Sequence, residues 1–116
     1  MFYTYIVASR RNGTLYIGQT NDLCRRAEEH RLGTFPGFPQ DHNCIYLVWY
    51  EEHPTRQAAF IRERRLKKWE RDWKLKMIED ANPQWLDLGL CPMWPLPDKK
   101  TYPEIWDEAL KTALPR

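Results

Sequence analysis

The chain has 116 residues, a formal net charge of +2, 42% hydrophobic residues and 29% charged residues. This length favours one compact domain, and the composition is typical of a globular protein. The sequence predicts no leader peptide and no membrane partner, because a span needs about 20 consecutive apolar residues. The three cysteines, Cys24, Cys44 and Cys91, form no C-x-x-C pair, so we expect reduced thiols in a cytoplasmic protein.

The first third of the chain predicts a β-hairpin followed by a helix. Residues 2–9 and 14–18 are rich in aromatic and β-branched side chains. They flank Asn12-Gly13, a pair that tolerates the positive φ of tight hairpin turns. Polar side chains at 20–22 can cap a helix over 23–32, a stretch that contains no helix breaker.

The middle of the chain predicts a loop, a strand and a long helix. Residues 33–43 are rich in Gly and Pro and indicate a loop, and residues 44–52 have strand composition. Thr55 is placed to cap a helix that runs to about Ile78, with or without a kink near Glu70. One face of this helix is apolar and suits docking on a sheet; it holds Ala59, Leu66, Trp69 and Trp73.

These elements predict an α/β (α+β) fold, with a small three-stranded, mainly antiparallel sheet flanked by helices. We expect residues 1–87 to form the domain and residues 88–116 to form a Pro- and Trp-rich C-terminal extension. Residues 104–114 have the composition of a short helix within that extension. This extension is either wrapped on the domain through Trp85, Trp94 and Trp106 or partly mobile. We expect wrapping, because tryptophans are costly to expose to water.

A run of basic residues marks the second half of the long helix. A charge run of this kind is most often a solvated, salt-bridged helix face. The alternative is that part of it follows a nucleic-acid backbone. The candidates for nucleic-acid binding are Lys67, Lys68, Arg71 and Lys74.

Four side chains near the predicted hairpin carry groups that phosphodiester chemistry can use. Arg26 and His30 are four residues apart, so they share one helix face, and we expect both to be exposed there. Tyr16 lies near the end of the preceding strand, and Tyr5 lies on its partner strand. Arginine offers a planar fork to phosphate, and tyrosine and histidine can move protons. Taken singly, each residue has an ordinary explanation in packing or surface charge, and so has Glu63.

Taken together, the motifs resemble the GIY-YIG nuclease superfamily. They are similar in particular to its small stand-alone members, which resemble the nuclease domain of the incision subunit of the DNA-repair excinuclease. The resemblance spans roughly residues 2–87. "YTY" at 3–5 stands where the family has GIY, and "YIG" at 16–18 matches as written. "NPQWLDL" at 82–88 resembles the ending that is common among the small members.

The resemblance implies an endonuclease that hydrolyses phosphodiester bonds of nucleic acid, with DNA expected. It makes Tyr5, Tyr16, Arg26, His30 and Glu63 the catalytic residues. Glu63 would hold Mg²⁺ or Mn²⁺, and Arg26 would clamp the scissile phosphate. One of the two tyrosines would be the general base, with His30 sharing its proton. Which tyrosine has this role stays open.

Two other functions fit the same fold. One is a nucleic-acid-binding module without catalysis, and the other is a protein-interaction domain that uses its tryptophans. The complete set of five site residues favours the nuclease, because neither alternative has a physical need for all of them. The sequence assigns no catalytic role to His42, and it leaves the substrate structure and the oligomeric state open.

Overall fold

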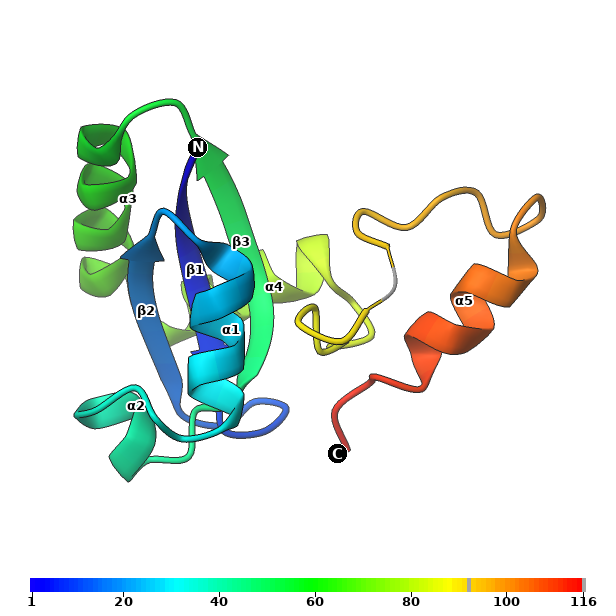
Figure 1. Ribbon diagram of the computed structural model, residues 1–116, viewed down its shortest axis with the longest axis horizontal. Coiled ribbons are helices and arrows are strands. Elements are labelled where there is room, and N and C mark those ends of the chain that lie inside the picture. The colour runs from blue at the N-terminus through cyan, green and yellow to red at the C-terminus, as the bar shows by residue number, and fades with distance from the viewer. Residues whose placement is uncertain (92, 116) are drawn as a thin grey trace.

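The computed structural model describes residues 1–91 and 93–115, so Pro92 and Arg116 of the expected extension lie outside the described residues. Three antiparallel strands form one sheet in the order β2-β1-β3. Figure 1 shows α1 crossing in front of the sheet, α3 on the side of β2, and the C-terminal segment on the side of β3. The elements are β1 (Phe2–Ala8), β2 (Leu15–Thr20), α1 (Leu23–Arg31), α2 (Phe38–Asp41), β3 (Tyr46–His53), α3 (Arg56–Lys68), α4 (Arg71–Ala81) and α5 (Pro103–Leu110). The predicted fold class is confirmed.

The predicted hairpin joins β1 and β2 as expected. Asn12 has a φ of 56°, and the Gly13 amide donates to the Arg10 carbonyl at 2.9 Å. Asparagine is one of the few residues that adopts this backbone conformation readily. The hairpin register places Tyr5 opposite Gly18. This pairing sets the position of the Tyr5 ring in the site described below.

Successive side chains of β1 point to opposite faces of the sheet, and each face carries its own hydrophobic cluster. Tyr5 and Val7 belong to a cluster with Ala27 of α1. Ile6 and Ala8 belong to a second cluster that includes residues of α3 and α4. The helices α1 and α3 therefore cover opposite faces, and a site that uses both must lie at an edge of the sheet.

The long predicted helix is two helices. Trp69 and Glu70 have extended backbone conformations, with ψ of 148° and 152°, and these end α3 and start α4 in a new direction. Trp73 was expected on the same apolar face as Trp69. The two rings do meet edge to face, with 6.0 Å between their centres, but the break turns α4 and leaves Trp73 57% exposed, so Trp73 is not docked on the sheet as expected.

The sequence predicted a loop for the whole Gly- and Pro-rich segment, and this prediction was wrong in part. Residues Phe38–Asp41 of the segment form the short helix α2, which starts after Gly37 with a φ of 94°. Pro39 falls in the first turn, where the missing amide proton costs nothing. This turn sets Phe38 and His42 one above the other, four residues apart.

The segment after α4 is tied back to the rest of the chain. The Leu88 amide donates to the Leu47 carbonyl of β3 at 2.8 Å. Arg31 of α1 forms an ion pair at 3.2 Å with Asp87, whose side chain is 3% exposed. Ala109 of α5 is buried in the cluster on the α1 face. The described helices include none with the length and apolar character that crossing a membrane requires.

Candidate active site

Tyr5, His30 and Arg26 form one connected group between β1 and α1. The Tyr5 hydroxyl lies 2.9 Å from Nε2 of His30. Nη1 of Arg26 donates to the Tyr5 oxygen at 3.4 Å and to the Gln19 carbonyl at 3.4 Å, and Nε donates to Glu29 at 3.3 Å. Because the Tyr5 oxygen accepts from Arg26, its own proton is available to Nε2 of a neutral imidazole.

His30 is held in the neutral form. Burial lowers the pKa of His30 from 6.5 to about 4, and the neighbouring Arg26 charge adds to this effect. Nδ1 of His30 is buried and has no hydrogen-bond partner among the described residues. With Nε2 accepting from Tyr5, the proton of the neutral ring lies on Nδ1. A second proton would place a positive charge in a buried site beside Arg26, so this environment favours an imidazole that accepts a proton only transiently.

Burial also raises the pKa of the Tyr5 phenol above its usual value, although the hydrogen bond from Arg26 acts in the opposite direction. The negative charge of Glu63 contributes to the rise, which places Glu63 within electrostatic reach of Tyr5. The phenol is therefore protonated at neutral pH. Tyr5 can take a proton from another group only if it passes its own proton on at the same time.

The exposed position expected for His30 was wrong. Its side chain is 2% exposed, because the face of α1 that carries Ala27 and His30 packs toward the sheet. The Arg26 side chain is 23% exposed and lies at the margin of this face. Arg26 can therefore meet a ligand from solvent, whereas the buried His30 contacts Tyr5 and would influence a ligand only through it.

Glu63 and Lys67 of α3 approach the same edge of the sheet from the other face. Nζ of Lys67 lies 2.8 Å from a Glu63 oxygen and 5.9 Å from the centre of the Tyr16 ring. The Glu63 side chain is 13% exposed. The edge formed by β2 thus brings together residues from both faces. Lys67, predicted only as a nucleic-acid contact, lies within the site.

The donor set at Glu63 suits a hard cation that keeps much of its water. No group of three or more His, Cys, Asp or Glu side chains gathers into a metal site in the described part of the chain. Mg²⁺ commonly binds through one or two carboxylates, with water and substrate phosphate as its other ligands. A single, largely buried carboxylate therefore fits Mg²⁺ or Mn²⁺, and does not fit a structural zinc site.

Phe35 packs on Arg26 and His30, and the sequence pattern assigned it no role in the candidate site. The Arg26 guanidinium lies 4.4 Å from the centre of the Phe35 ring, and the His30 ring lies 4.8 Å from it. A cation over an aromatic face is attracted to it, so Phe35 restricts the orientation of Arg26. The sequence did carry a signal for this contact, because Phe35 is an aromatic residue that follows soon after the helix with Arg26 and His30.

Comparison with known proteins shows the family to which this chain belongs. The model of the GIY-YIG catalytic domain matches residues 1–76 of the chain. The chain belongs to the GIY-YIG family. It is 35% identical over 79 residues to a UPF0213 protein of Haloquadratum walsbyi, covering 68% of this chain and 88% of the relative. It is 31% identical over 78 residues to a UPF0213 protein of Staphylococcus aureus, covering 67% of this chain and 94% of the relative. No solved structure gives a significant match.

The GIY-YIG catalytic domain is a nuclease domain in its superfamily, and its nucleases typically use a divalent metal and act on nucleic acid. Tyr5, Tyr16, Arg26 and His30 lie on the α1 face of the sheet, and Glu63 reaches the β2 edge from α3. The five residues that the resemblance singled out therefore come from both faces to one edge of this GIY-YIG domain.

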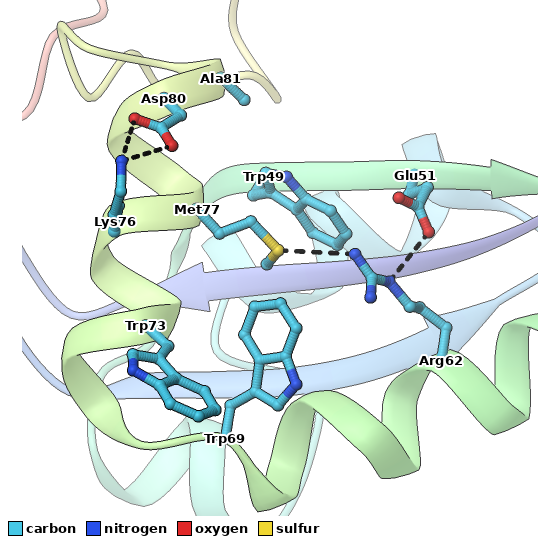
Figure 2. A pocket seen from close by; sticks show the side chains of 9 residues that line it. All are labelled: Trp49, Glu51, Arg62, Trp69, Trp73, Lys76, Met77, Asp80 and Ala81. Carbon is cyan, nitrogen blue, oxygen red and sulfur yellow. Dashed lines mark hydrogen bonds and ion pairs between the residues drawn. The ribbon is translucent and has the colours of Figure 1, made fainter.

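A wider groove of the GIY-YIG domain lies between β3, α3 and α4 and contains none of these five residues. Figure 2 shows Arg62 reaching across this groove between two tryptophan rings. Its cations are already paired, Arg62 with Glu51 at 3.1 Å and Lys76 with Asp80 at 3.0 Å. Because none of the five residues lies in this groove, we assign it no part in phosphate chemistry.

Gly18 of the YIG motif makes room for the Tyr5 hydroxyl. A methyl group at this position would lie 2.5 Å from the Tyr5 oxygen. We expect Gly18→Ala to lower the free energy of unfolding by about 1–3 kcal/mol, the usual cost of overpacking a rigid buried ring. Chemical denaturation measures this change. A variant as stable as the wild type would mean that the Tyr5 ring is free to move.

The low pKa of His30 predicts a dependence of stability on pH. Between pH 6.5 and about 4 the unfolded chain binds a proton at His30 that the folded chain does not, so stability falls as the pH falls through this window. Between pH 7 and pH 5, the free energy of unfolding of the wild type should fall by about 2 kcal/mol more than that of His30→Gln. Denaturation at both pH values measures the difference, and His42→Gln is the control for removing a surface histidine. Equal losses in the wild type and His30→Gln would contradict the burial argument.

Proposed function

We propose that this protein is a metal-dependent endonuclease that hydrolyses phosphodiester bonds of nucleic acid, with DNA as the expected substrate. The observation that carries the proposal is the contact of Tyr5 with both His30 and Arg26 at the edge that Glu63 also reaches. A proton acceptor, a phosphate clamp and a metal-binding carboxylate are the parts that this hydrolysis needs.

Tyr5 is proposed as the general base. Its hydroxyl is within hydrogen-bond distance of His30, whereas Tyr16 meets the His30 ring as an aromatic contact at 5.9 Å. The attacking water would give a proton to the Tyr5 oxygen while the Tyr5 proton passes to Nε2 of His30. The water oxygen bonds to phosphorus, the bond from phosphorus to the 3′ oxygen breaks, and the 3′ oxygen takes a proton from solvent. No phenolate is needed in advance, in keeping with the raised pKa of Tyr5.

Arg26 is proposed as the phosphate clamp. Its contacts with Tyr5, Glu29 and Phe35 fix the plane of the guanidinium before a substrate arrives. A preorganised cation stabilises the negative charge that builds on phosphate oxygens, and it needs no reorganisation during the reaction. Because the Arg26 guanidinium also donates to Tyr5, it would hold the Tyr5 oxygen close to the phosphate that the water attacks.

Glu63 is proposed to hold the divalent cation. When bound, this cation would stabilise charge on the phosphate and on the leaving oxygen. The Lys67 ammonium, 2.8 Å from Glu63, would turn toward a substrate phosphate when the cation takes its place at the carboxylate. Lys67 would thus pair with Glu63 before the cation binds and contact a substrate phosphate afterwards.

The basic residues beyond the site are proposed to follow the nucleic-acid backbone. Lys68 is exposed and lines a groove next to Glu63 together with Lys67. Arg71 has another role in the fold, because its guanidinium donates to the Asn12 and Gly13 carbonyls of the hairpin turn at 2.6 and 2.7 Å. The proposed backbone contacts are therefore carried chiefly by Lys67, Lys68 and Lys74.

A panel of labelled substrates tests the proposed function. The purified protein is incubated with duplex, nicked, flap and single-stranded DNA and with the matching RNAs, with Mg²⁺ and separately with a chelator. We expect at least one of these substrates to be cut in Mg²⁺ and none with chelator. Binding that weakens with salt but is never followed by cutting would instead support a nucleic-acid-binding module. Neither binding nor cutting would favour a protein-interaction domain.

A further inference from the structure

A stack of three rings runs outward from the catalytic group. The Tyr16 and Phe38 rings are nearly parallel, with 23° between their planes and 6.3 Å between their centres. Phe38 and His42 stack more closely, with 18° between planes and 4.0 Å between centres. The inner end of the stack therefore lies at a proposed catalytic residue, and its outer end is an imidazole ring.

The outer two rings are built into one helical turn. The His42 amide donates to the Phe38 carbonyl at 3.0 Å, and Nδ1 of His42 lies 3.0 Å from the same oxygen. The buried Pro39 anchors this turn in the fold. The platform formed by Phe38 and His42 thus has its geometry set before any ligand binds.

This platform faces solvent. Phe38 is 44% exposed and His42 is exposed as well, whereas Phe35 in the same segment is turned inward onto Arg26 and His30. A ring that served only to cover Tyr16 would gain most by being buried. The exposed stacked pair instead offers aromatic surface that a planar ligand can cover.

The surroundings indicate which planar ligand fits. Positive charge lies near the inner end of the stack: Nζ of Lys67 is 5.9 Å from the centre of the Tyr16 ring, and Arg26 lies over Phe35, whose ring centre is 6.3 Å from that of Tyr16. Aromatic rings next to cations bind single strands, because every base has a face that can stack while the cations meet the phosphates. Within a duplex the faces of a base are covered by its neighbours. Only an unpaired or terminal base leaves a face free to stack on the outer face of His42.

We propose that the outer face of His42, with Phe38 stacked behind it, forms a platform for an unpaired base of the nucleotide next to the scissile phosphate. The substrate of this site is then a nucleic acid with unpaired nucleotides at the cleavage position, such as a single strand or the base of a flap. This inference rests on the proposed function, which it narrows to a class of substrate. His42 acts in it by binding substrate and takes no part in proton transfer.

Fluorescence of a base analogue tests the platform without any cleavage. Single-stranded decamers carry one 2-aminopurine, placed at each position in turn, and are titrated with the protein in the presence of chelator. Stacking on an aromatic ring quenches 2-aminopurine. We expect quenching at one or two positions with the wild type, and its loss in a Phe38→Leu/His42→Ala double variant. Tyr102→Leu removes an aromatic side chain of similar exposure, 48%, on the C-terminal segment, and should keep the quenching.

Cleavage gives the second readout and separates this inference from the proposed function. In Mg²⁺ the double variant should lose about tenfold in kcat/KM on a substrate with unpaired nucleotides at the cut, mainly through KM. Quenching that the double variant retains, or its absence at every position in the wild type, overturns the platform even if the protein cuts. Quenching by a wild type that never cuts supports the platform and overturns the nuclease function.

Discussion

Replacing Arg26 with alanine is expected to slow cleavage by about 10²–10³-fold, the usual effect of removing one preorganised donor from a charged transition state. Arg26→Lys should recover little of this rate, because a lysine ammonium lacks the planar fork that meets phosphate oxygens in pairs. The rates are measured under single-turnover conditions, so that substrate binding and the chemical step are separated.

The neighbouring Arg25 provides a matched control for this experiment. Its side chain is 71% exposed and it also pairs with Glu29, at 3.7 Å. Arg25→Ala removes the same charge from the same helix without touching Tyr5, so its rate should stay near that of the wild type. Equal rate losses in Arg25→Ala and Arg26→Ala would show that net charge matters and that the clamp does not exist.

Tyr5→Phe is expected to lower the rate by about 10²–10⁴-fold, the range for losing a general base. The ring stays in place, but His30 and Arg26 lose their shared hydrogen-bond partner. Leaving buried polar groups unpaired costs about 1–3 kcal/mol. The rate must therefore be compared at equal folded fraction, which circular dichroism at the assay temperature provides.

Tyr16→Phe distinguishes the two tyrosines. It deletes the hydroxyl of a ring whose centre lies 5.9 Å from Nζ of Lys67, and it keeps the stack with Phe38. Because Tyr16 makes no hydrogen bond with His30 in the described part of the chain, the loss of its hydroxyl should slow cleavage less than the loss of the Tyr5 hydroxyl. A larger effect in Tyr16→Phe than in Tyr5→Phe would exchange the roles proposed for the two residues.

Local signals in the sequence were enough to predict the hairpin and the residues at which the helices start. Asn12 adopts the positive φ that its turn requires, and Asp22 and Thr55 accept backbone protons as helix caps, at 3.1 Å each. Such features depend on a few neighbouring residues. For this reason the strands, and the helices that carry Arg26 and Glu63, could be predicted from the pattern.

Features that depend on packing could not be predicted in the same way. The burial of His30 depends on which face of α1 meets the sheet, and the periodicity of a short charged helix leaves that choice open. The exposure of Trp73 follows from two extended residues at the end of α3, for which the sequence supplies neither Gly nor Pro. The contacts of Phe35 with Arg26 depend on the path of a Gly- and Pro-rich segment, which has no periodicity to read.

The central claim is that Glu63 supports metal-dependent cleavage in a GIY-YIG site. The direct measurement is the rate of cleavage as a function of Mg²⁺ concentration for the wild type and for Glu63→Gln, with Glu70→Gln as a control at an exposed position. The wild type should cut in Mg²⁺ and stop with chelator. Glu70→Gln should cut at the wild-type rate. Glu63→Gln should cut more slowly than the wild type by about 10²-fold or more at every metal concentration. Its unfolding temperature should stay close to that of the wild type. Cutting by Glu63→Gln at the wild-type rate, or cutting by the wild type that chelator does not stop, would contradict the account.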